Sequence, residues 1–252
     1  MKVTFLGTGT SVGVPRIGCT CSVCQSQDDK NKRLRCALHL EYGAHSVLVD
    51  TGPDLRTQAL TYGVHRVDAV LFTHGHADHL YGLDDVRSYC FDRQEPLPCY
   101  ADARTMDRIE RVFDYAFDDN APSATPQIRL QKIEGDFDLF GQSIEPIRVY
   151  HGRLPVLAFR IGHFAYATDT SHIPDESMDR LRGLDVLVLD ALRHKAHPTH
   201  FNLEQALEVI EELKPKRAYL THIAHDLEHN ATNATLPDGV ELAYDGLVLE
   251  TG

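Results

Sequence analysis

The chain has 252 residues, of which 42% are hydrophobic and 25% are charged, so it can bury a large core. Acidic residues outnumber basic ones 37 to 25, and the formal net charge of −12 argues against a broad surface that binds nucleic acid through Lys and Arg. The N-terminal apolar run is too short for a signal peptide and no stretch approaches a membrane span, so we expect a single cytoplasmic domain spanning residues 1–252 with no membrane or nucleic-acid partner.

The first half of the chain predicts strands and helices separated by long loops. Apolar runs predict strands at residues 2–6, 37–42, 46–49 and 67–72, and the second and third of these form a hairpin. Helices are expected at residues 55–62, 80–88 and 105–117. The glycines after the first strand do not form a dinucleotide-binding motif, because Val12 stands where the third glycine is needed.

The second half becomes regular towards its end. Residues 118–126 are rich in turn formers and predict a surface loop. Strands are expected at 127–133, 142–150, 156–161 and 164–167, followed by helix 176–181, strand 186–189, helix 203–213 and strand 217–220. This final alternation is typical of helices packed outside a sheet, and Asn202 with Gln205 predicts a capping box at the start of the long helix.

A dense group of metal-binding residue types follows the fourth predicted strand. His74, His76, Asp78 and His79 stand within six residues, in the stretch Thr73–His79 that directly follows the apolar run Val70–Phe72. Imidazole and carboxylate suit zinc, manganese and iron, and nothing structural requires H-x-H-x-D-H at this density. The motif therefore predicts a site for two adjacent metal ions.

Further candidate ligands end other apolar strands. These strand-end residues are Asp50, His74, His151, Asp169, Asp190 and His222. We expect them to gather along one sheet edge, where rigid backbone can position them. Asp50 is a candidate to orient a ligand imidazole, although a turn-forming aspartate would also fit its place before Thr51-Gly52-Pro53.

A second metal site is predicted in the loop at about residues 13–35. Cys19, Cys21 and Cys24 are too close together for a conventional disulfide framework, and they supply three thiolates where a structural zinc ion needs four ligands. His225, three residues after His222, is the best candidate for the fourth ligand, with Cys36 and His39 as weaker ones. The other cysteines, Cys36, Cys90 and Cys99, are expected to be small buried apolar residues.

With its H-x-H-x-D-H motif the chain resembles the metallo-β-lactamase superfamily of hydrolases over essentially its whole length. The resemblance implies an α/β (α+β) fold, a four-layer αββα sandwich with two divalent ions at the sheet edges. It assigns His74, His76 and His151 to the first ion, and Asp78, His79 and His222 to the second. Asp169 would bridge the two ions, and a hydroxide between them would attack a phosphodiester.

The cysteine element, together with the Thr221-His222-Ile223-Ala224-His225 segment, looks like that of the PhnP-type phosphodiesterases. This resemblance implies opening of 5-phosphoribosyl 1,2-cyclic phosphate to ribose 1,5-bisphosphate, with manganese, zinc or iron in the active site. We predict His200 as the general acid, poised by Asp190, and count Asp78 among the catalytic residues as well as the ligands. Arg153, Arg193 and Lys195 are candidate contacts for a small phosphorylated substrate.

Other functions remain compatible with these motifs. A related hydrolase could act on another phosphodiester, a thioester or a lactone, because a metal hydroxide also attacks acyl carbon. A tRNA-processing nuclease should carry a basic, glycine-rich arm that this chain lacks. A noncatalytic metal-binding or redox-sensing module would not need so complete a ligand set. The quaternary state stays open, with a homodimer as one candidate.

Overall fold

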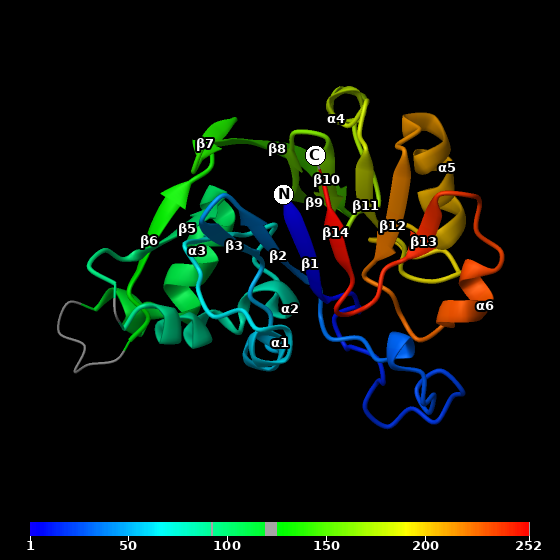
Figure 1. The fold of residues 1–252 in the computed structure, drawn as a ribbon, viewed down its shortest axis with the longest axis horizontal. Coiled ribbons are helices and arrows are strands. Elements are labelled where there is room, and N and C mark those ends of the chain that lie inside the picture. The colour runs from blue at the N-terminus through cyan, green and yellow to red at the C-terminus, as the bar shows by residue number, and fades with distance from the viewer. Residues whose placement is uncertain (92, 119–124, 252) are drawn as a thin grey trace.

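The strands form two seven-stranded sheets in a computed structural model that describes residues 1–91, 93–118 and 125–251 (Figure 1). In spatial order, the first sheet contains β14 (Val248–Glu250), β1 (Lys2–Gly7), β2 (Ala37–Tyr42), β3 (His45–Val49), β4 (Ala69–Leu71), β5 (Leu97–Ala101) and β6 (Ile128–Lys132). The second contains β13 (Val240–Leu242), β12 (Arg217–Thr221), β11 (Val186–Asp190), β10 (Phe164–Ala167), β9 (Leu154–Ile161), β8 (Gln142–His151) and β7 (Phe137–Leu139).

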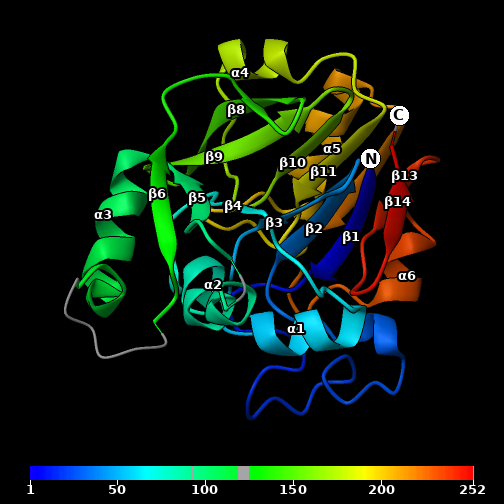
Figure 2. The same ribbon diagram turned by 60° about the vertical axis from the view of Figure 1, so that its left-hand side comes forward.

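The two sheets face each other, and helices cover their outer faces (Figures 1 and 2). Between the sheets, side chains from both form one apolar cluster, in which the rings of Phe5 and Tyr219 lie 6.2 Å apart. Outside the first sheet lie α1 (Leu55–Tyr62) and α3 (Ala103–Val112), and outside the second lie α4 (Asp175–Arg180) and α5 (Leu203–Leu213). The predicted αββα sandwich is therefore confirmed.

The regular end of the chain folds as its sequence predicts. Strand β11 is buried at every position and pairs in parallel with β10 and β12, which explains its unbroken apolar run. Helix α5 begins with the predicted capping box, in which the Asn202 side chain accepts from the backbone N–H of Gln205 and the Gln205 side chain accepts from that of Asn202.

The middle of the chain differs from the prediction. The helix expected at 80–88 is a short α2 (Ala77–Leu80) followed by a 3-10 helix η2 (Leu83–Tyr89). Helix α3 begins earlier than expected because Asp102 caps it by accepting from the backbone N–H of Thr105, and it gives way to the 3-10 helix η3 (Asp114–Phe117). Residues 119–124 of the predicted loop lie outside the described residues.

Several elements were not predicted. Strand β5 contains Pro98, which cannot donate a ladder hydrogen bond and makes the segment read as a loop. Strands β7, β13 and β14, the 3-10 helix η1 (Asp29–Asn31) and helix α6 (His229–Asn233) are too short to give a clear periodic signal. No helix in the described parts of the chain is long and apolar enough to cross a membrane.

Candidate metal centre

The strand-end residues gather where the two sheets meet. Asp50 and His74 follow β3 and β4 in the first sheet. The second sheet supplies the others: His151 ends β8, Asp169 follows β10, Asp190 ends β11 and His222 follows β12. The expectation of one sheet edge is therefore wrong: the residues come from adjacent edges of two sheets, brought together by the packing of the sandwich.

The backbone turns sharply at three of these positions. Asp50, Asp169 and His222 have φ values of 66°, 52° and 58°, in the left-handed region that residues other than glycine rarely adopt. Only two other non-glycine residues in the described part of the chain share this feature. Such conformations persist where surrounding structure enforces them, and they often lie at functional sites.

Two overlapping groups of ligand-type side chains lie within reach of common ions. Asp78, His79, Asp169 and His222 place their ligand atoms within 4.8 Å of one another, as do His74, His76 and Asp169. The carboxylate of Asp169 belongs to both groups: one oxygen lies 2.9 Å from Nε2 of His79 in the first group, and the other lies 4.0 Å from Nε2 of His74 in the second. This is the arrangement expected of a bridging ligand.

His151 lies at the same centre. Its ring is 5.1 Å from that of His76, and its ligand atom groups with those of Asp169 and His200. The structure thus brings together all seven residues predicted for the binuclear site: His74, His76, Asp78, His79, His151, Asp169 and His222.

Hydrogen bonds fix which ring nitrogen of each histidine faces the centre. Asp50 accepts from Nδ1 of His79 at 2.7 Å and from the hydroxyl of Thr73 at 2.8 Å. Because that hydroxyl proton goes to Asp50, Thr73 accepts from Nδ1 of His74 at 3.0 Å. The carbonyl of Thr199 accepts from Nδ1 of His151 at 2.6 Å. In each ring, Nε2 therefore keeps a free lone pair for a metal ion.

Several of these lone pairs are buried without a partner. The Nε2 atoms of His74, His79 and His222 are inaccessible and form no hydrogen bond with the described residues, although those of His79 and His222 lie 2.9 Å and 3.4 Å from the Asp169 carboxylate. Buried polar atoms are rarely left in this state, because an unmade hydrogen bond costs free energy. Neutral imidazoles converging on carboxylates are a donor set that fits divalent metal ions.

The electrostatics of the centre favour positive charge. Burial opposes a proton on His79, but the neighbouring carboxylates Asp169, Asp78 and Asp50 overcome it and hold the pKa of that imidazole well above its ordinary value. Burial also opposes a charge on Asp169, yet the histidines around it, His222 first, hold its pKa well below its usual range. A proton on His79 and a metal ion compete for the same lone pair, so the protonated form stands in for a bound cation.

His200 and Asp190 form a pair beside the centre. Asp190 accepts from Nδ1 of His200 at 2.7 Å and from the backbone N–H of Thr170 at 2.7 Å. His200 is buried, and its ring stacks on that of His222 with centroids 4.6 Å apart. The neighbouring His194 and Lys195 are exposed. Among the side chains of this loop, His200 is thus the one placed against the candidate ligands.

Close backbone contacts hold the motif against the first sheet. A Cβ on Gly52 would lie 2.1 Å from the carbonyl oxygen of Asp78, so only glycine fits at this position. The backbone N–H of Thr51 donates to the carbonyl of His79 in the same contact. The turn after β3 therefore sets the position of the two ligands on α2.

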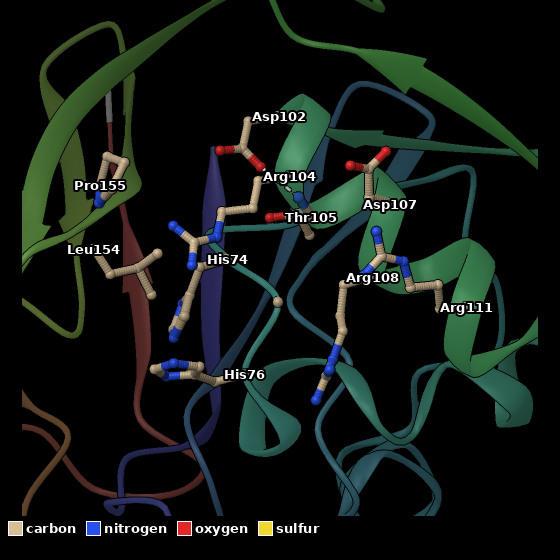
Figure 3. A pocket seen from close by; sticks show the side chains of 11 residues that line it. His74, His76, Asp102, Arg104, Thr105, Asp107, Arg108, Arg111, Leu154 and Pro155 are labelled. Carbon is tan, nitrogen blue, oxygen red and sulfur yellow. Dashed lines mark hydrogen bonds between the residues drawn. The ribbon is translucent and has the colours of Figure 1, made fainter.

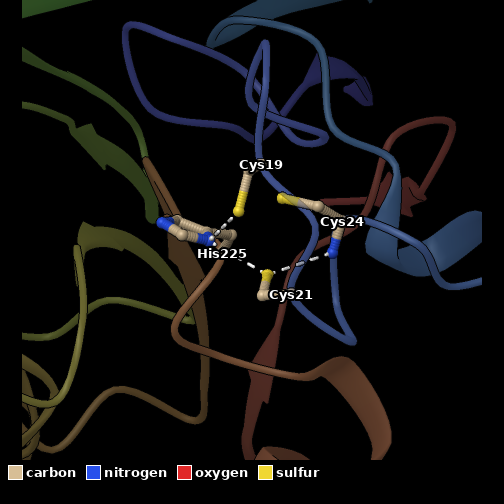
Figure 4. A group of neighbouring side chains, drawn as sticks. All are labelled: Cys19, Cys21, Cys24 and His225. Atoms are coloured by element: carbon tan, nitrogen blue, oxygen red, sulfur yellow. Dashed lines mark hydrogen bonds between the residues drawn. The ribbon is translucent and has the colours of Figure 1, made fainter.

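The predicted cysteine site also comes together (Figure 4). The ligand atoms of Cys19, Cys21, Cys24 and His225 all lie within 4.8 Å of one another. Nδ1 of His225 is 3.4 Å from the sulfur of Cys19 and 3.2 Å from that of Cys21. Three thiolates and one imidazole are a donor set that fits structural zinc.

The other cysteines and the weaker candidates lie elsewhere. Cys36, Cys90 and Cys99 are buried, as expected of small apolar residues, and are at most 7% exposed. Nε2 of His39 pairs with the hydroxyl of Ser46. Neither Cys36 nor His39 belongs to the cysteine group.

A cavity of about 490 Å³ opens beside His74 and His76 (Figure 3). Arginines from α3 line its far wall: Arg104, Arg108 and Arg111. They were not among the predicted anion contacts. The sequence signal that could have grouped them is their spacing of four and three residues, which places all three on one face of a helix. The sequence gives no indication that this face lies beside the metal motif.

Residues 45–223 match the beta-lactamase superfamily domain. A solved structure described as a new diphosphatase from the PhnP family is 47% identical, covers 98% of this chain and 96% of its own, and superposes with a TM-score of 0.94. The protein belongs to the β-lactamase superfamily. The identity to that diphosphatase places it in the PhnP family, which confirms the resemblance drawn from the sequence.

Two other relatives show that the fold is shared more widely and that this chain matches only part of a longer protein. Zinc-bound PqqB from Methylobacterium extorquens is 19% identical, with full coverage of both chains and a TM-score of 0.79, and so shows the shared fold alone. An octanoyltransferase from Porphyromonas gingivalis is 38% identical over 98% of this chain. The chain spans about half the length of that relative, at 51%. The metallo-β-lactamase fold itself implies divalent metal ions.

Proposed function

We propose that this member of the PhnP family is a binuclear metal-dependent phosphodiesterase that opens a small cyclic phosphodiester. The observation that carries the proposal is the convergence of five imidazoles and two carboxylates, with buried Nε2 atoms free to bind metal. Two ions held there would lower the pKa of water and neutralise charge on a phosphoryl oxygen. The substrate to test first is 5-phosphoribosyl 1,2-cyclic phosphate, with ribose 1,5-bisphosphate as product.

Residues of the protein orient the proposed metal ligands and supply a proton to the leaving oxygen. Asp50, Thr73 and the Thr199 carbonyl orient three of the proposed ligand imidazoles. In the hydrolysis, the oxygen of water joins phosphorus, and the bond between phosphorus and the O2 oxygen of the ribose breaks. The departing oxygen then takes a proton from Nε2 of His200, and the charge of Asp190 stabilises the imidazolium that donates it. The proton that the attacking water loses goes to solvent, and His200 takes one back from solvent, so that one water molecule is consumed.

The cysteine group would serve this site indirectly. We propose that Cys19, Cys21, Cys24 and His225 hold one structural zinc ion. The same loop is tied to the C-terminal segment by Asn31, which donates to Glu228 and accepts from the backbone N–H of His229. Because His225 would be one of its ligands, the zinc ion would also hold the loop against the chain segment that carries His222.

A second candidate is cleavage of a diphosphate, a P–O–P linkage. The solved PhnP-family relative at 47% identity is described as a diphosphatase, which favours this reaction. The same centre suits it, because both reactions attack phosphorus and expel an oxygen. The two differ in leaving group: a phosphate needs less help from a general acid than a sugar alkoxide does.

The test begins with purified protein whose metal content is measured. It is then assayed on 5-phosphoribosyl 1,2-cyclic phosphate, bis(p-nitrophenyl) phosphate, a sugar nucleoside diphosphate and a thioester, with manganese, zinc or iron restored. His76→Ala and Asp169→Ala should abolish phosphodiester hydrolysis, whereas His65→Ala, an exposed histidine away from the site, should retain it. Preference for the diphosphate would establish the second candidate. Turnover of the thioester alone, or of no substrate, would refute both.

A further inference from the structure

Two buried polar atoms beside the metal centre are not accounted for by the proposed ligand set. Oδ1 of Asp190 and Nδ1 of His222 are both inaccessible and form no hydrogen bond with the described residues. Nε2 of His222 would bind a metal ion, but Nδ1 of the same ring and the second oxygen of Asp190 would not. These two atoms therefore call for a partner other than the metal ions.

The two residues lie on neighbouring strands of the second sheet. Asp190 ends β11 and pairs in register with Thr221, the residue that precedes His222. The ligand-type atoms of Asp190, His200 and His222 all lie within 4.8 Å of one another. The ring of His222 lies at only 14° to that of His200, whose Nδ1 already donates to Asp190. One carboxylate is thus within reach of both imidazoles.

The two unpaired atoms have complementary hydrogen-bonding roles. Nε2 of His222 lies 3.4 Å from Asp169 and 3.6 Å from Asp78, so this nitrogen is the one directed at the centre. A neutral imidazole that binds metal through Nε2 carries its proton on Nδ1, which is then a donor. One oxygen of Asp190 already accepts from His200, and the other is free to accept. Among the buried side-chain atoms without a partner in the described parts of the chain, it is the only carboxylate oxygen.

We infer that Asp190 is a positioning residue for His222 as well as for His200: its Oδ1 accepts from Nδ1–H of His222, directly or through one water molecule. The inference rests on the proposed binding of metal by His222 and deepens it. A bridging water molecule suits a separation longer than a hydrogen bond, because it accepts from the ring and donates to the carboxylate. Asp190 would then hold the general acid and one metal ligand together, as Asp50 holds His79 on the first sheet.

Replacing Asp190 with asparagine tests the second contact while keeping the first. The carbonyl oxygen of asparagine can keep the hydrogen bonds from His200 and from the backbone N–H of Thr170. Its NH₂ group then takes the place of Oδ1 and presents a donor to a ring nitrogen that also carries a proton. The ring of His222 relieves this conflict by moving its proton to Nε2, where it removes the lone pair that binds metal.

The first measurement is zinc binding by competition with a chelator of known affinity. Asp190→Asn should bind one zinc ion about 10- to 100-fold more weakly than wild type. His200→Gln, which removes the other imidazole but leaves Oδ1 of Asp190 in place, should bind zinc as wild type does. Asp68→Asn, which changes a buried aspartate away from the candidate ligands, is the control for the loss of a buried carboxylate. Unchanged zinc affinity in Asp190→Asn, or an equal loss in Asp68→Asn, would overturn the inference.

The second measurement is direct and needs no variant to fold. A crystal structure of the zinc-loaded wild-type protein should show Oδ1 of Asp190 bonded to Nδ1 of His222 or to a water molecule that also contacts Nδ1. Imidazole NMR of the same protein should show a proton on Nδ1 of His222 that exchanges slowly with solvent, and its signal should change in Asp190→Asn while that of His79 stays. Another acceptor on Nδ1 of His222, or a deprotonated Nδ1, would refute the inference.

Neither measurement depends on turnover. If no phosphodiester or diphosphate is hydrolysed, the proposed function fails, and zinc affinity and the structure still decide the role of Asp190. If hydrolysis is observed but Nδ1 of His222 is not paired with Asp190, the proposed function stands and this inference falls.

Discussion

Replacing Asp50 with asparagine should weaken metal binding while leaving the fold intact. Asp50 is fully buried, and its two oxygens accept three hydrogen bonds of 2.7 to 2.8 Å, from the backbone and hydroxyl of Thr73 and from Nδ1 of His79. Asparagine has nearly the same shape and tolerates the left-handed backbone. Its amide, however, places a donor where one of the carboxylate oxygens accepted.

Either orientation of the amide leaves two donors facing each other. If its oxygen stays near His79, its NH₂ meets the backbone N–H of Thr73; if its NH₂ turns towards His79, the ring must move its proton to Nε2 and loses the metal-binding lone pair. Losing such an orienting carboxylate typically costs 10- to 100-fold in metal affinity, or about 1.4 to 2.7 kcal/mol. The buried donor should also lower the free energy of unfolding by about 1 to 3 kcal/mol.

The assay is competition for metal between the protein and a chelator of known affinity, combined with activity measured against free metal concentration. Asp50→Asn should bind one ion more weakly than wild type and regain activity at higher metal. The matched control is Asp68→Asn, since Asp68 is a buried aspartate directly before β4 that accepts from the backbone N–H of Ser46 and touches no candidate ligand. If both variants lose stability alike and both bind metal as wild type does, the orienting role of Asp50 is refuted.

Three further changes test other parts of the structure. His200→Gln should slow release of a sugar alkoxide by about 10²- to 10⁴-fold but barely affect release of p-nitrophenolate, which leaves without a proton. Equal losses of activity on both substrates in steady-state assays would argue against His200 as a general acid. Cys21→Ser should reduce the metal content from three ions per chain to two and lower the melting temperature, as measured by elemental analysis and calorimetry; a variant that keeps three ions would contradict the proposed zinc site of the cysteine group. Burial and the nearby Arg33 lower the pKa of His229 from 6.5 to about 4, and Arg33 donates to its Nδ1, so the neutral ring is the folded form. Because the unfolded chain binds this proton more readily, stability should be complete above pH 6.5 and fall as the pH drops towards 4, and denaturant unfolding of His229→Gln should lack this part of the loss.

The sequence predicted the candidate site better than the elements around it. His74, His76, Asp78 and His79 are adjacent in the chain, so their grouping needed no knowledge of tertiary structure. The more distant ligand candidates were found because each ends a buried strand. The end of a strand can be recognised from the local sequence, without knowing how the strands pair. Their meeting across two sheets, rather than along one, depends on packing that strand patterns do not encode.

The parts that could not be predicted depend on tertiary contacts. Strand β5 is sandwiched between β4 and β6 despite Pro98, because pairing on both sides outweighs the missing donor. Thr199 orients His151 through a backbone carbonyl, which any residue could supply. The α3 arginines look like an ordinary solvated helix face until the fold brings them beside His74.

The segment after β12 connects the two candidate metal sites. His222 faces the candidate metal centre and His225 faces the cysteines, only three residues apart. Between them, the backbone N–H of Ile223 donates to the carbonyl of Thr8, and its carbonyl accepts from the backbone N–H of Thr10, so the segment is fixed to the start of the cysteine-bearing loop. The left-handed backbone at His222 is the conformation that turns one histidine inward while the chain continues towards the other. A zinc ion on His225 would thus add a second restraint to this turn and so help to hold His222 in position.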